Sequence, residues 1–212
     1  MEIHVWSDVA CPWCYIGKRS LETALEKFAG RDEVIVRWRS FELDPSAPAK
    51  RDLPMDELLA RKYGMSAPQV AATQRRITEA AATFGLSYHL DDLQSGNTFD
   101  AHRMIHLATH LSKGGEMKER LLKAYLEEGQ LMSDHAVLAR CAEEVGLPSD
   151  EVDETLTTDR FATEVRFDEE LAANNGFSGV PTFVVDGRFA VSGAQDPGVL
   201  LKMLERAAST SA

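Results

Sequence analysis

The sequence lacks the features of a membrane protein, a secreted precursor or a nucleic-acid-binding protein. No run of about 18 apolar residues occurs, and the N-terminus has no basic segment followed by an apolar one, so neither a transmembrane helix nor a signal peptide is predicted. Basic residues are outnumbered 34 to 23, and the net charge of -11 argues against a broad surface for nucleic acid or for an anionic membrane. We therefore expect a cytoplasmic protein.

Cysteine is also scarce, with 3 in 212 residues, and two of the three stand close together. Cys11 and Cys14 belong to the motif Cys-Pro-Trp-Cys. A cytosolic thiol pair is usually catalytic or redox-sensing rather than a structural disulfide. A zinc site would need two further ligands, for which Cys141 and 6 histidines remain, and two incidental cysteines are the third interpretation.

The motif lies at the junction of a predicted strand (2–7) and a predicted helix that begins at Cys11 or Pro12 and ends near residue 29. The partial positive charge of a helix N-terminus favours a thiolate at Cys11 over the thiol. Pro12 suits the first helical position, where its missing N–H would have had no partner. Cys14 begins the apolar face of this helix, so we expect a reachable sulfur at position 11 and a sheltered one at position 14.

The remaining pattern predicts an α/β protein with a long helical segment in its middle. A second strand at 33–41 completes a strand-helix-strand unit, and 42–52 reads as a connection with two prolines. A hairpin with an Asp-Gly turn and a helix beginning at Pro197 close the chain. Helices are predicted between these units near 54–63, 67–84, 98–112, 116–128, 135–145, 150–158 and 160–174, several of them ended by glycines such as Gly114.

Four stretches together resemble a known family. Residues 8–17 read Asp-x-x-Cys-Pro-Trp-Cys-Tyr-Ile-Gly, residues 97–103 contain Asn-Thr followed by Ala-His-Arg, residues 179–182 read Gly-Val-Pro-Thr, and residues 191–195 read Val-Ser-Gly-Ala-Gln. The chain thus resembles the DsbA-like branch of the thioredoxin superfamily and, more narrowly, the FrnE-type oxidoreductases. The likeness spans nearly the whole chain.

The resemblance implies a thioredoxin fold, with a mixed four-stranded sheet between helices and a large all-helical insertion. Residues 1–45 and 177–212 would form the discontinuous thioredoxin-like domain, and residues 46–176 the inserted helical domain above the active site. It also implies a cis peptide bond between Val180 and Pro181 that faces the cysteines, whereas an ordinary trans proline in a turn is the alternative.

The implied activity is that of a thiol-disulfide oxidoreductase or isomerase, with Cys11 as the attacking thiolate and Cys14 as the resolving thiol. Substrate-binding positions, by the same resemblance, are Pro12, Trp13, Val180, Pro181, Asn97 and His102. No cofactor is expected beyond the redox-active cysteine pair, with glutathione as a candidate co-substrate. The expected partners are proteins or small molecules that carry a thiol or disulfide, and the protein is expected to be a monomer or a homodimer.

Asp8 is the acid nearest to the motif. Thioredoxins and DsbA commonly carry a buried acid six positions before the first cysteine, but Val5 stands there in this sequence. One hypothesis is that Asp8, or a water beside it, assists the deprotonation of Cys14. The other is that Asp8 is a turn residue that binds its own backbone.

Three histidines, His102, His106 and His110, recur every fourth residue on one helix face. Such a stripe is typical of a metal site, of a solvated face or of the wall of a cleft near the cysteines. No carboxylate or cysteine joins the stripe in sequence, so no metal is assigned to it. His102 falls in the shared motif and is the one that we expect near the site.

Other residues have simpler interpretations. Cys141 shares a helix face with apolar residues and is predicted to be a buried, inert thiol. Trp13 and Tyr15 flank the motif and are candidates for an apolar substrate surface, with packing as the alternative for Tyr15. Asn97 is a candidate for capping the next helix.

Two functions of other classes stay open. The kappa-class transferases and the 2-hydroxychromene-2-carboxylate isomerases share the architecture and use glutathione, but they typically replace one or both cysteines, often with serine. The third possibility is a binding module that uses the cleft to hold a protein partner without turnover.

Overall fold

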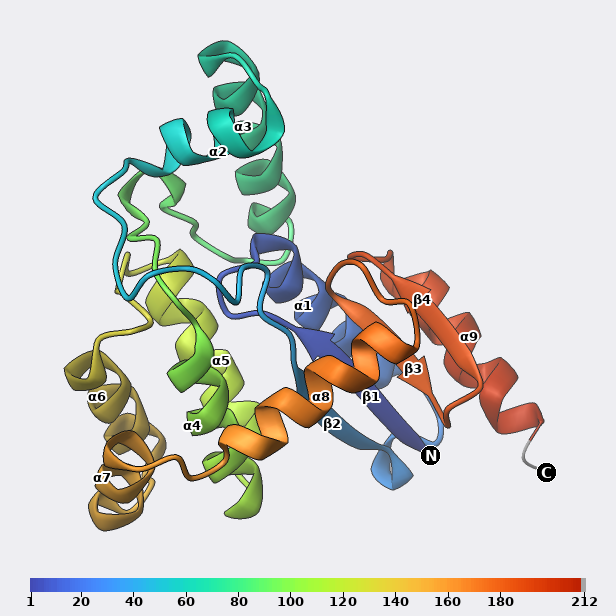
Figure 1. Ribbon diagram of the computed structural model, residues 1–212. Helices are drawn as coiled ribbons and strands as arrows, with labels where there is room; N and C mark the ends of the chain where they lie inside the picture. Colours follow the sequence, from blue (N-terminus) through green and yellow to red (C-terminus); the bar gives the residue numbers. More distant parts are fainter. Residues whose placement is uncertain (211–212) are drawn as a thin grey trace.

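A mixed four-stranded sheet forms the centre of residues 1–210, which are the residues that the structure, a computed structural model, describes. The order is β2-β1-β3-β4, where β1 runs parallel to β2 and antiparallel to β3, and β4 runs antiparallel to β3 (Figure 1). The predicted fold class is confirmed. The strands are β1 (Glu2–Ser7), β2 (Ile35–Ser40), β3 (Thr182–Val185) and β4 (Phe189–Ser192).

Helices accompany the sheet at both ends of the sequence and fill the long segment between β2 and β3. They are α1 (Pro12–Lys27), α2 (Met55–Tyr63), α3 (Ala67–Ala82), α4 (Phe99–His110), α5 (Gly114–Leu126), α6 (His135–Val145), α7 (Ser149–Thr157), α8 (Ala162–Asn174) and α9 (Pro197–Ser209). Every predicted helix is present. One expectation was wrong, because Gly114 begins α5 instead of following the helix before it. A Cβ at this position would lie 2.3 Å from Thr109 Oγ1, so the close approach of α4 and α5 requires glycine.

The alternation of side chains along β1 decides which helices cover each face of the sheet. Ile3 and Val5 are buried in a core with side chains of α1 and α9. Trp6 faces the other way, and its indole N–H donates to the carbonyl oxygen of Asp168 in α8 at 2.9 Å. Figure 1 shows α8 crossing one face of the sheet, and the sheet is therefore covered on both sides.

Helix α1 is shared by two hydrophobic cores. Leu21 and Ala24 belong to the core between the sheet and α9. Cys14 and Tyr15, about two turns nearer to the start of the helix, belong to a second core built mainly from α4, α5 and α6. The cysteine motif therefore stands where the central helical segment packs on the sheet-bearing part. The division into separate domains at residues 45/46 and 176/177 stays a prediction.

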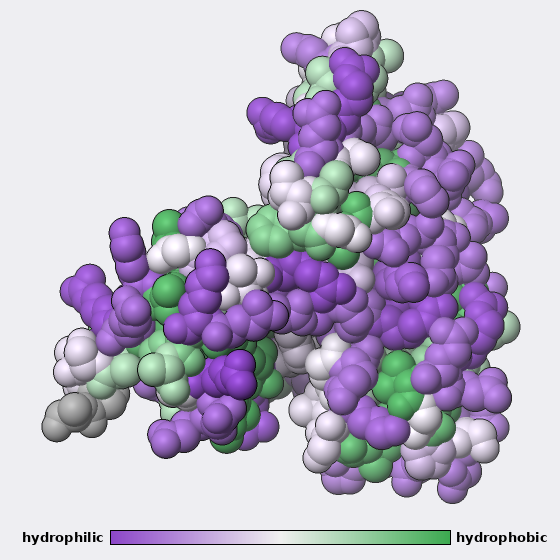
Figure 2. All heavy atoms as spheres, turned by 180° about the vertical axis from the view of Figure 1, so that it is seen from behind, coloured by the Kyte–Doolittle hydropathy of each residue, from purple (hydrophilic) through white to green (hydrophobic). Residues whose placement is uncertain are grey.

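Helices α2 and α3 project from the rest of the molecule above the start of α1 (Figure 1). The projection begins with the connection that the two prolines predicted, and Ser66 and Gln69 form a capping box at the start of α3. Figure 2 shows hydrophobic side chains gathered on the surface at the base of this projection. Among the described helices, none combines the length and the apolar character needed to cross a membrane.

Candidate active site

The two cysteines of the motif lie at the start of α1. Cys11 precedes the helix with an extended backbone (φ -98°, ψ 113°), and Pro12 takes the first helical position. The backbone N–H of Cys14 donates to the carbonyl oxygen of Cys11 at 3.0 Å. Both thiols are free, so the structure represents the reduced, dithiol form.

A cavity of about 660 Å³ lies between Cys11 and the projecting helices. Cys11, Pro12 and Trp13 line it from one side, whereas Cys14 is not among the lining residues. Only 5% of Cys11 and 1% of Cys14 is exposed. The sheltered position of Cys14 is as predicted, but Cys11 was expected to be reachable and is itself almost fully buried, facing the cavity rather than open solvent. The opposite wall consists largely of apolar side chains: Met55, Leu58, Leu59, Met65, Val70, Ile77, Leu90 and Leu93.

The loop before β3 brings Val180 and Pro181 to the cysteines. Their peptide bond is cis, and Val180 lines the cavity. The carbonyl oxygen of Val180 accepts a hydrogen bond from Cys11 Sγ at 3.6 Å. Pro181 is buried against α1, where a Cβ on Gly17 would lie 2.8 Å from its Cγ. Glycine at position 17 therefore allows this loop to approach the motif.

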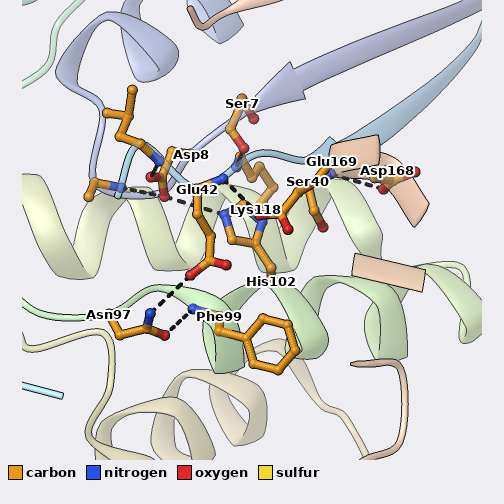
Figure 3. A network of polar contacts seen from close by, with 12 residues as sticks. Ser7, Asp8, Ser40, Glu42, Asn97, Phe99, His102, Lys118, Asp168 and Glu169 are labelled. Carbon is orange, nitrogen blue, oxygen red and sulfur yellow. Dashed lines mark hydrogen bonds and ion pairs between the residues drawn. The ribbon is translucent and has the colours of Figure 1, made fainter. Parts of the chain in front are cut away.

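Asp8 is buried at the end of β1 and also reaches the wall of the cavity. Its carboxylate accepts hydrogen bonds from the backbone N–H groups of Leu43 (2.8 Å) and Ala10 (3.2 Å), and His102 Nε2 lies 3.3 Å from Oδ1 (Figure 3). Burial by itself would raise the pKa of Asp8, but the His102 contact and the Leu43 N–H outweigh it and hold the pKa below the usual value. The bond from the Ala10 N–H matches the second interpretation of Asp8, a residue that binds within its own turn, and its role in deprotonating Cys14 stays a prediction.

The three histidines of the α4 stripe lie in different surroundings. His102 is buried beside Asp8, and burial lowers its pKa despite the favourable carboxylate, so the ring is neutral at pH 7. The nitrogen that faces the carboxylate then carries the proton. His106 instead lies 3.0 Å from Ser40 Oγ, and the ring of His110 packs near Phe161. Within residues 1–210, no group of three or more His, Cys, Asp or Glu side chains could hold a metal ion.

Cys14 has a polar neighbour that the sequence analysis missed. Lys118 of α5 is 1% exposed, and its ammonium donates to the carbonyl oxygen of Ser7 at 3.1 Å (Figure 3). Burial raises the pKa of Cys14 well above the usual thiol value, and the charge of Lys118 acts against this rise. A signal was present in the sequence, since Lys118 has helical spacing to Leu122 and Tyr125, on the face that α5 buries.

Asn97 is close to this region but outside the cavity lining. Its Oδ1 accepts from the backbone N–H of Phe99 at 2.8 Å, at the start of α4, and its Nδ2 donates to Glu42 at 3.1 Å (Figure 3). Asn97 therefore binds a free N–H at the start of α4, as one of its two interpretations expected, although it stands one residue before the N-cap Thr98.

The aromatic residues around the motif also have different positions and contacts. Trp13 lines the cavity. Tyr15 is buried and its hydroxyl donates to Glu119, so Tyr15 belongs to the packing between α1 and α5. Tyr88, which the sequence analysis did not single out, donates its hydroxyl to the carbonyl oxygen of Pro12 at 2.7 Å and so anchors the motif. Cys141 is fully buried in α6, and burial raises the pKa of its thiol.

Comparison with known proteins places these features in a family. Residues 2–205 match the family model of the DsbA-like thioredoxin domain. The chain is a member of this family. A solved structure, a probable DsbA oxidoreductase from Streptomyces coelicolor, is 39% identical and superposes with a TM-score of 0.94 over 99% of this chain and 90% of that one. YwbO of Bacillus subtilis (strain 168), an uncharacterized protein, is 29% identical over 96% of each chain.

More distant structures share the fold alone. A 2-hydroxychromene-2-carboxylate isomerase is 14% identical, with a TM-score of 0.73 over 99% of this chain and 95% of its own. DsbM, a cytosolic disulfide reductase from Pseudomonas aeruginosa, is 20% identical, with a TM-score of 0.65 over 97% and 98%, and has also been solved with GSH. The DsbA-like part of the predicted resemblance is confirmed, and the narrower FrnE-type resemblance stays a prediction.

Proposed function

We propose that this DsbA-like protein is a thiol-disulfide oxidoreductase in which Cys11 attacks and Cys14 resolves. The observation that carries the proposal is the unequal placement of the two sulfurs. Cys11 lines a cavity large enough for a substrate group, and Cys14 lies behind it in the core. A mechanism of attack followed by resolution requires this asymmetry, because the second thiol must act only after the first has captured the substrate.

The chemistry proceeds in two exchanges. The Cys11 thiolate attacks one sulfur of a substrate disulfide, the substrate S–S bond breaks, and the leaving half departs as a thiolate that takes a proton from water. Cys14 then loses its proton and attacks the Cys11 sulfur, which releases the second half. The products are a Cys11–Cys14 disulfide and two substrate thiols, so two electrons have moved to the substrate; the reverse sequence oxidises a dithiol.

Asp8 is proposed to assist the release of the Cys14 proton, directly or through a water. Support comes from its position, since Asp8 reaches both the cavity wall and the polar surroundings of Cys14. The carboxylate keeps its charge at neutral pH, because its pKa is held below the usual value. An ionised carboxylate on the wall of a cavity is a suitable acceptor for a proton on its way to solvent.

The proposed substrates are proteins or small molecules that carry a thiol or disulfide, with glutathione as a candidate co-substrate. The apolar wall opposite Cys11 favours a substrate with apolar groups next to its sulfur. The relation in fold to a disulfide reductase that has been solved with GSH supports glutathione, and the cytosolic location of that reductase supports the cytoplasm as the compartment.

Insulin reduction by dithiothreitol tests the proposal with the wild type, Cys11→Ser and Cys14→Ser. We expect acceleration by the wild type alone, since each single thiol leaves one exchange impossible. Cys14→Ser should accumulate a mixed disulfide through Cys11, visible by mass spectrometry as protein plus substrate. The proposal is wrong if graded alkylation labels Cys14 ahead of Cys11, or if no disulfide substrate is turned over.

A glutathione-dependent isomerase or transferase is the second candidate, supported by the fold shared with the 2-hydroxychromene-2-carboxylate isomerase. Such an activity uses the sulfur of glutathione instead of a protein disulfide. The double variant Cys11→Ser/Cys14→Ser would then keep glutathione conjugation or isomerase activity, whereas the oxidoreductase loses all activity. Inactivity of the wild type in both assays would favour a binding module.

A further inference from the structure

Tyr125 of α5 differs from the other buried tyrosines in the bonding of its hydroxyl. The hydroxyls of Tyr15 and Tyr88 donate to Glu119 and to the carbonyl oxygen of Pro12. The hydroxyl of Tyr125 has no hydrogen-bond partner within residues 1–210, although the residue is only 4% exposed. A buried tyrosine hydroxyl normally has one. Tyr125 lines the active-site cavity, and its hydroxyl is not fully enclosed, so its accessible part faces that cavity.

Thr98, the N-cap residue of α4, shows the same departure. A threonine hydroxyl at this position usually accepts a backbone N–H of the first helical turn, but that of Thr98 does not, and Asn97 binds the N–H of Phe99 instead. The other buried threonines of the described chain, Thr155 and Thr182, donate to backbone carbonyls at 2.8 Å. Thr98 is 5% exposed and lines the cavity, so its hydroxyl is available to a group bound there.

A short series of contacts connects Thr98 with the cysteine motif. Thr98 stands one helical turn before His102, whose backbone N–H donates to its carbonyl oxygen at 3.1 Å. The ring of His102 contacts Asp8, and Asp8 accepts from the N–H of Ala10, the residue before Cys11. A group next to a sulfur bound at Cys11 is therefore expected near this end of α4.

The polar side chains of this lining are uncharged and can bond in either direction. The hydroxyls of Tyr125 and Thr98 each donate or accept. Burial and, to a smaller extent, the charge of Asp8 raise the pKa of Tyr125, so its hydroxyl keeps its proton at neutral pH. Gln74 of α3 adds an amide to the same lining, and its Nε2 has no hydrogen-bond partner within residues 1–210. Unpaired polar groups are thus gathered at this cavity.

The charged groups of the lining make a carboxylate a poor partner for these hydroxyls. Asp8 is ionised at neutral pH and repels an anion in the part of the cavity that it lines. Of the two cations in the lining, Arg51 is already paired with Asp44, and the exposed Lys62 lies over the ring of Tyr63. An amide is uncharged and offers both an N–H donor and a C=O acceptor, so it matches the hydroxyls without this repulsion.

We propose that the hydroxyls of Tyr125 and Thr98 bind an amide group beside the sulfur of the substrate. The protein then prefers disulfides of cysteine peptides and of other acylated aminothiols. One hydroxyl accepts from the amide N–H, the other donates to its carbonyl oxygen, and the apolar wall receives the acyl chain. This inference rests on the proposed function, because it names the substrate class of the same cavity.

Two disulfides test this preference in the wild type. One is the disulfide of N-butanoylcysteamine, whose amide nitrogen is separated from the sulfur by two carbon atoms, as in a cysteine residue. The other is the disulfide of 2-mercaptoethyl butanoate, in which an ester oxygen replaces the N–H. The rate constant for oxidation of the reduced protein, divided by that of the same disulfide with dithiothreitol, should be about threefold to tenfold higher for the amide. Equal normalised rate constants would overturn the proposal.

Tyr125→Phe and Thr98→Val each remove one hydroxyl at nearly constant volume. Each should lower the amide-to-ester ratio by about threefold. Tyr15→Phe is the matched control, since it removes a buried hydroxyl outside the cavity lining and should keep the wild-type ratio. The proposal is wrong for either residue whose variant also keeps that ratio. The comparison of amide and ester in the wild type decides the case even if a variant fails to fold.

Binding without sulfur chemistry separates this inference from the proposed function. The S-methyl thioethers of the same two compounds cannot exchange, and calorimetry measures their dissociation constants for the reduced protein. The amide should bind about threefold to tenfold more tightly than the ester, even if neither disulfide oxidises the protein. Exchange with no preference for the amide in either measurement would leave the proposed function standing and overturn this inference alone.

Discussion

Two polar clusters contact α4 one turn apart, through His102 and His106, and they differ in how their charges are balanced. The cysteine cluster consists of Asp8, His102 and Lys118. The seam cluster, where β2, α4 and α8 meet, consists of Arg39, Ser40, His106 and Asp168. In the seam cluster the Asp168 carboxylate meets Arg39 at 2.9 Å, the backbone N–H of Ser40 at 2.9 Å and His106 Nε2 at 3.2 Å.

In the cysteine cluster, the two charged groups are not paired with opposite charges in this way. The ammonium of Lys118 meets a neutral carbonyl, and the Asp8 carboxylate meets a neutral imidazole and two backbone N–H groups. An incompletely balanced charge costs stability, and it remains available to respond when a nearby thiol ionises. The comparison suggests that the seam cluster holds the fold together and that the cysteine cluster serves the thiols.

The strongest test of this division is Asp168→Ala. The change leaves Arg39 and a buried N–H without their acceptor, so we expect the free energy of unfolding to fall by about 3 kcal/mol or more. The pH dependence of disulfide exchange at permissive temperature should stay as in the wild type. Urea unfolding and insulin reduction measure the two quantities, and an altered pH profile would contradict the assignment of this cluster to stability.

A smaller, pH-dependent effect is expected at Glu42, which adjoins the seam. Burial, together with the nearby Glu169, raises the pKa of Glu42 from 4.5 to about 7. Between these values the folded chain retains a proton that the unfolded chain has released. The stabilisation by protonated Glu42 is therefore present below about pH 4.5 and is lost as pH rises toward 7, by as much as about 3 kcal/mol.

Glu42→Gln should remove this dependence, since glutamine stays neutral and can still accept from Asn97. Unfolding free energies at the two ends of the window, for the wild type and the variant, measure the difference. Parallel pH curves for the two proteins would show that Glu42 is already ionised in the folded state.

Asp8→Asn tests the role assigned to the cysteine cluster. The amide keeps the acceptor for Leu43 but loses the charge, so the free energy of unfolding should fall by about 1 kcal/mol at neutral pH. Folding lowers the pKa of Asp8, so its ionised carboxylate stabilises the folded wild type at pH values above the pKa of the unfolded state. This stabilisation is lost as pH falls through the lowered pKa of the folded state. The pH profile of the exchange reaction should shift in the variant, and an unchanged profile would exclude the relay.

The smallest effect on the exchange reaction is expected at Cys141. It lies fully buried in α6, outside the cavity lining, and burial raises its pKa. Cys141→Ala should leave the rate of insulin reduction unchanged and cost about 1 kcal/mol of stability for the lost sulfur. A marked loss of exchange activity would mean that a third thiol takes part and that the two-cysteine scheme is incomplete.

The helices and strands were predictable because their signals are local. Asp186 and Gly187 both adopt positive φ values, 48° and 66°, as the Asp-Gly pair of a tight hairpin turn requires. The position of Pro12 at the start of α1 likewise follows from its fixed φ and missing N–H. Periods of two and of 3.6 residues need no knowledge of distant parts of the chain.

The candidate site was predictable only in part, because its contacts are not local. Cys11 and Cys14 were evident from their spacing, and His102 was assigned near the site through a family motif. Lys118, however, binds a carbonyl 111 positions away in sequence, and a lysine on an amphipathic helix is normally solvated. A cover of inserted helices above the active site was implied by the family resemblance, but the near-complete burial of Cys11 was not predicted.

The sequence by itself therefore determined the order of strands and helices, since short-range sterics and hydrogen bonding set it, and it placed the two cysteines of the motif at the start of a helix. Tertiary structure alone decided the environment of those sulfurs. It placed Cys11 at the wall of a cavity, brought Asp8 against His102 and buried the charge of Lys118 at the end of β1. Burial and charge depend on what the folded chain brings together, and both control how readily a thiol ionises.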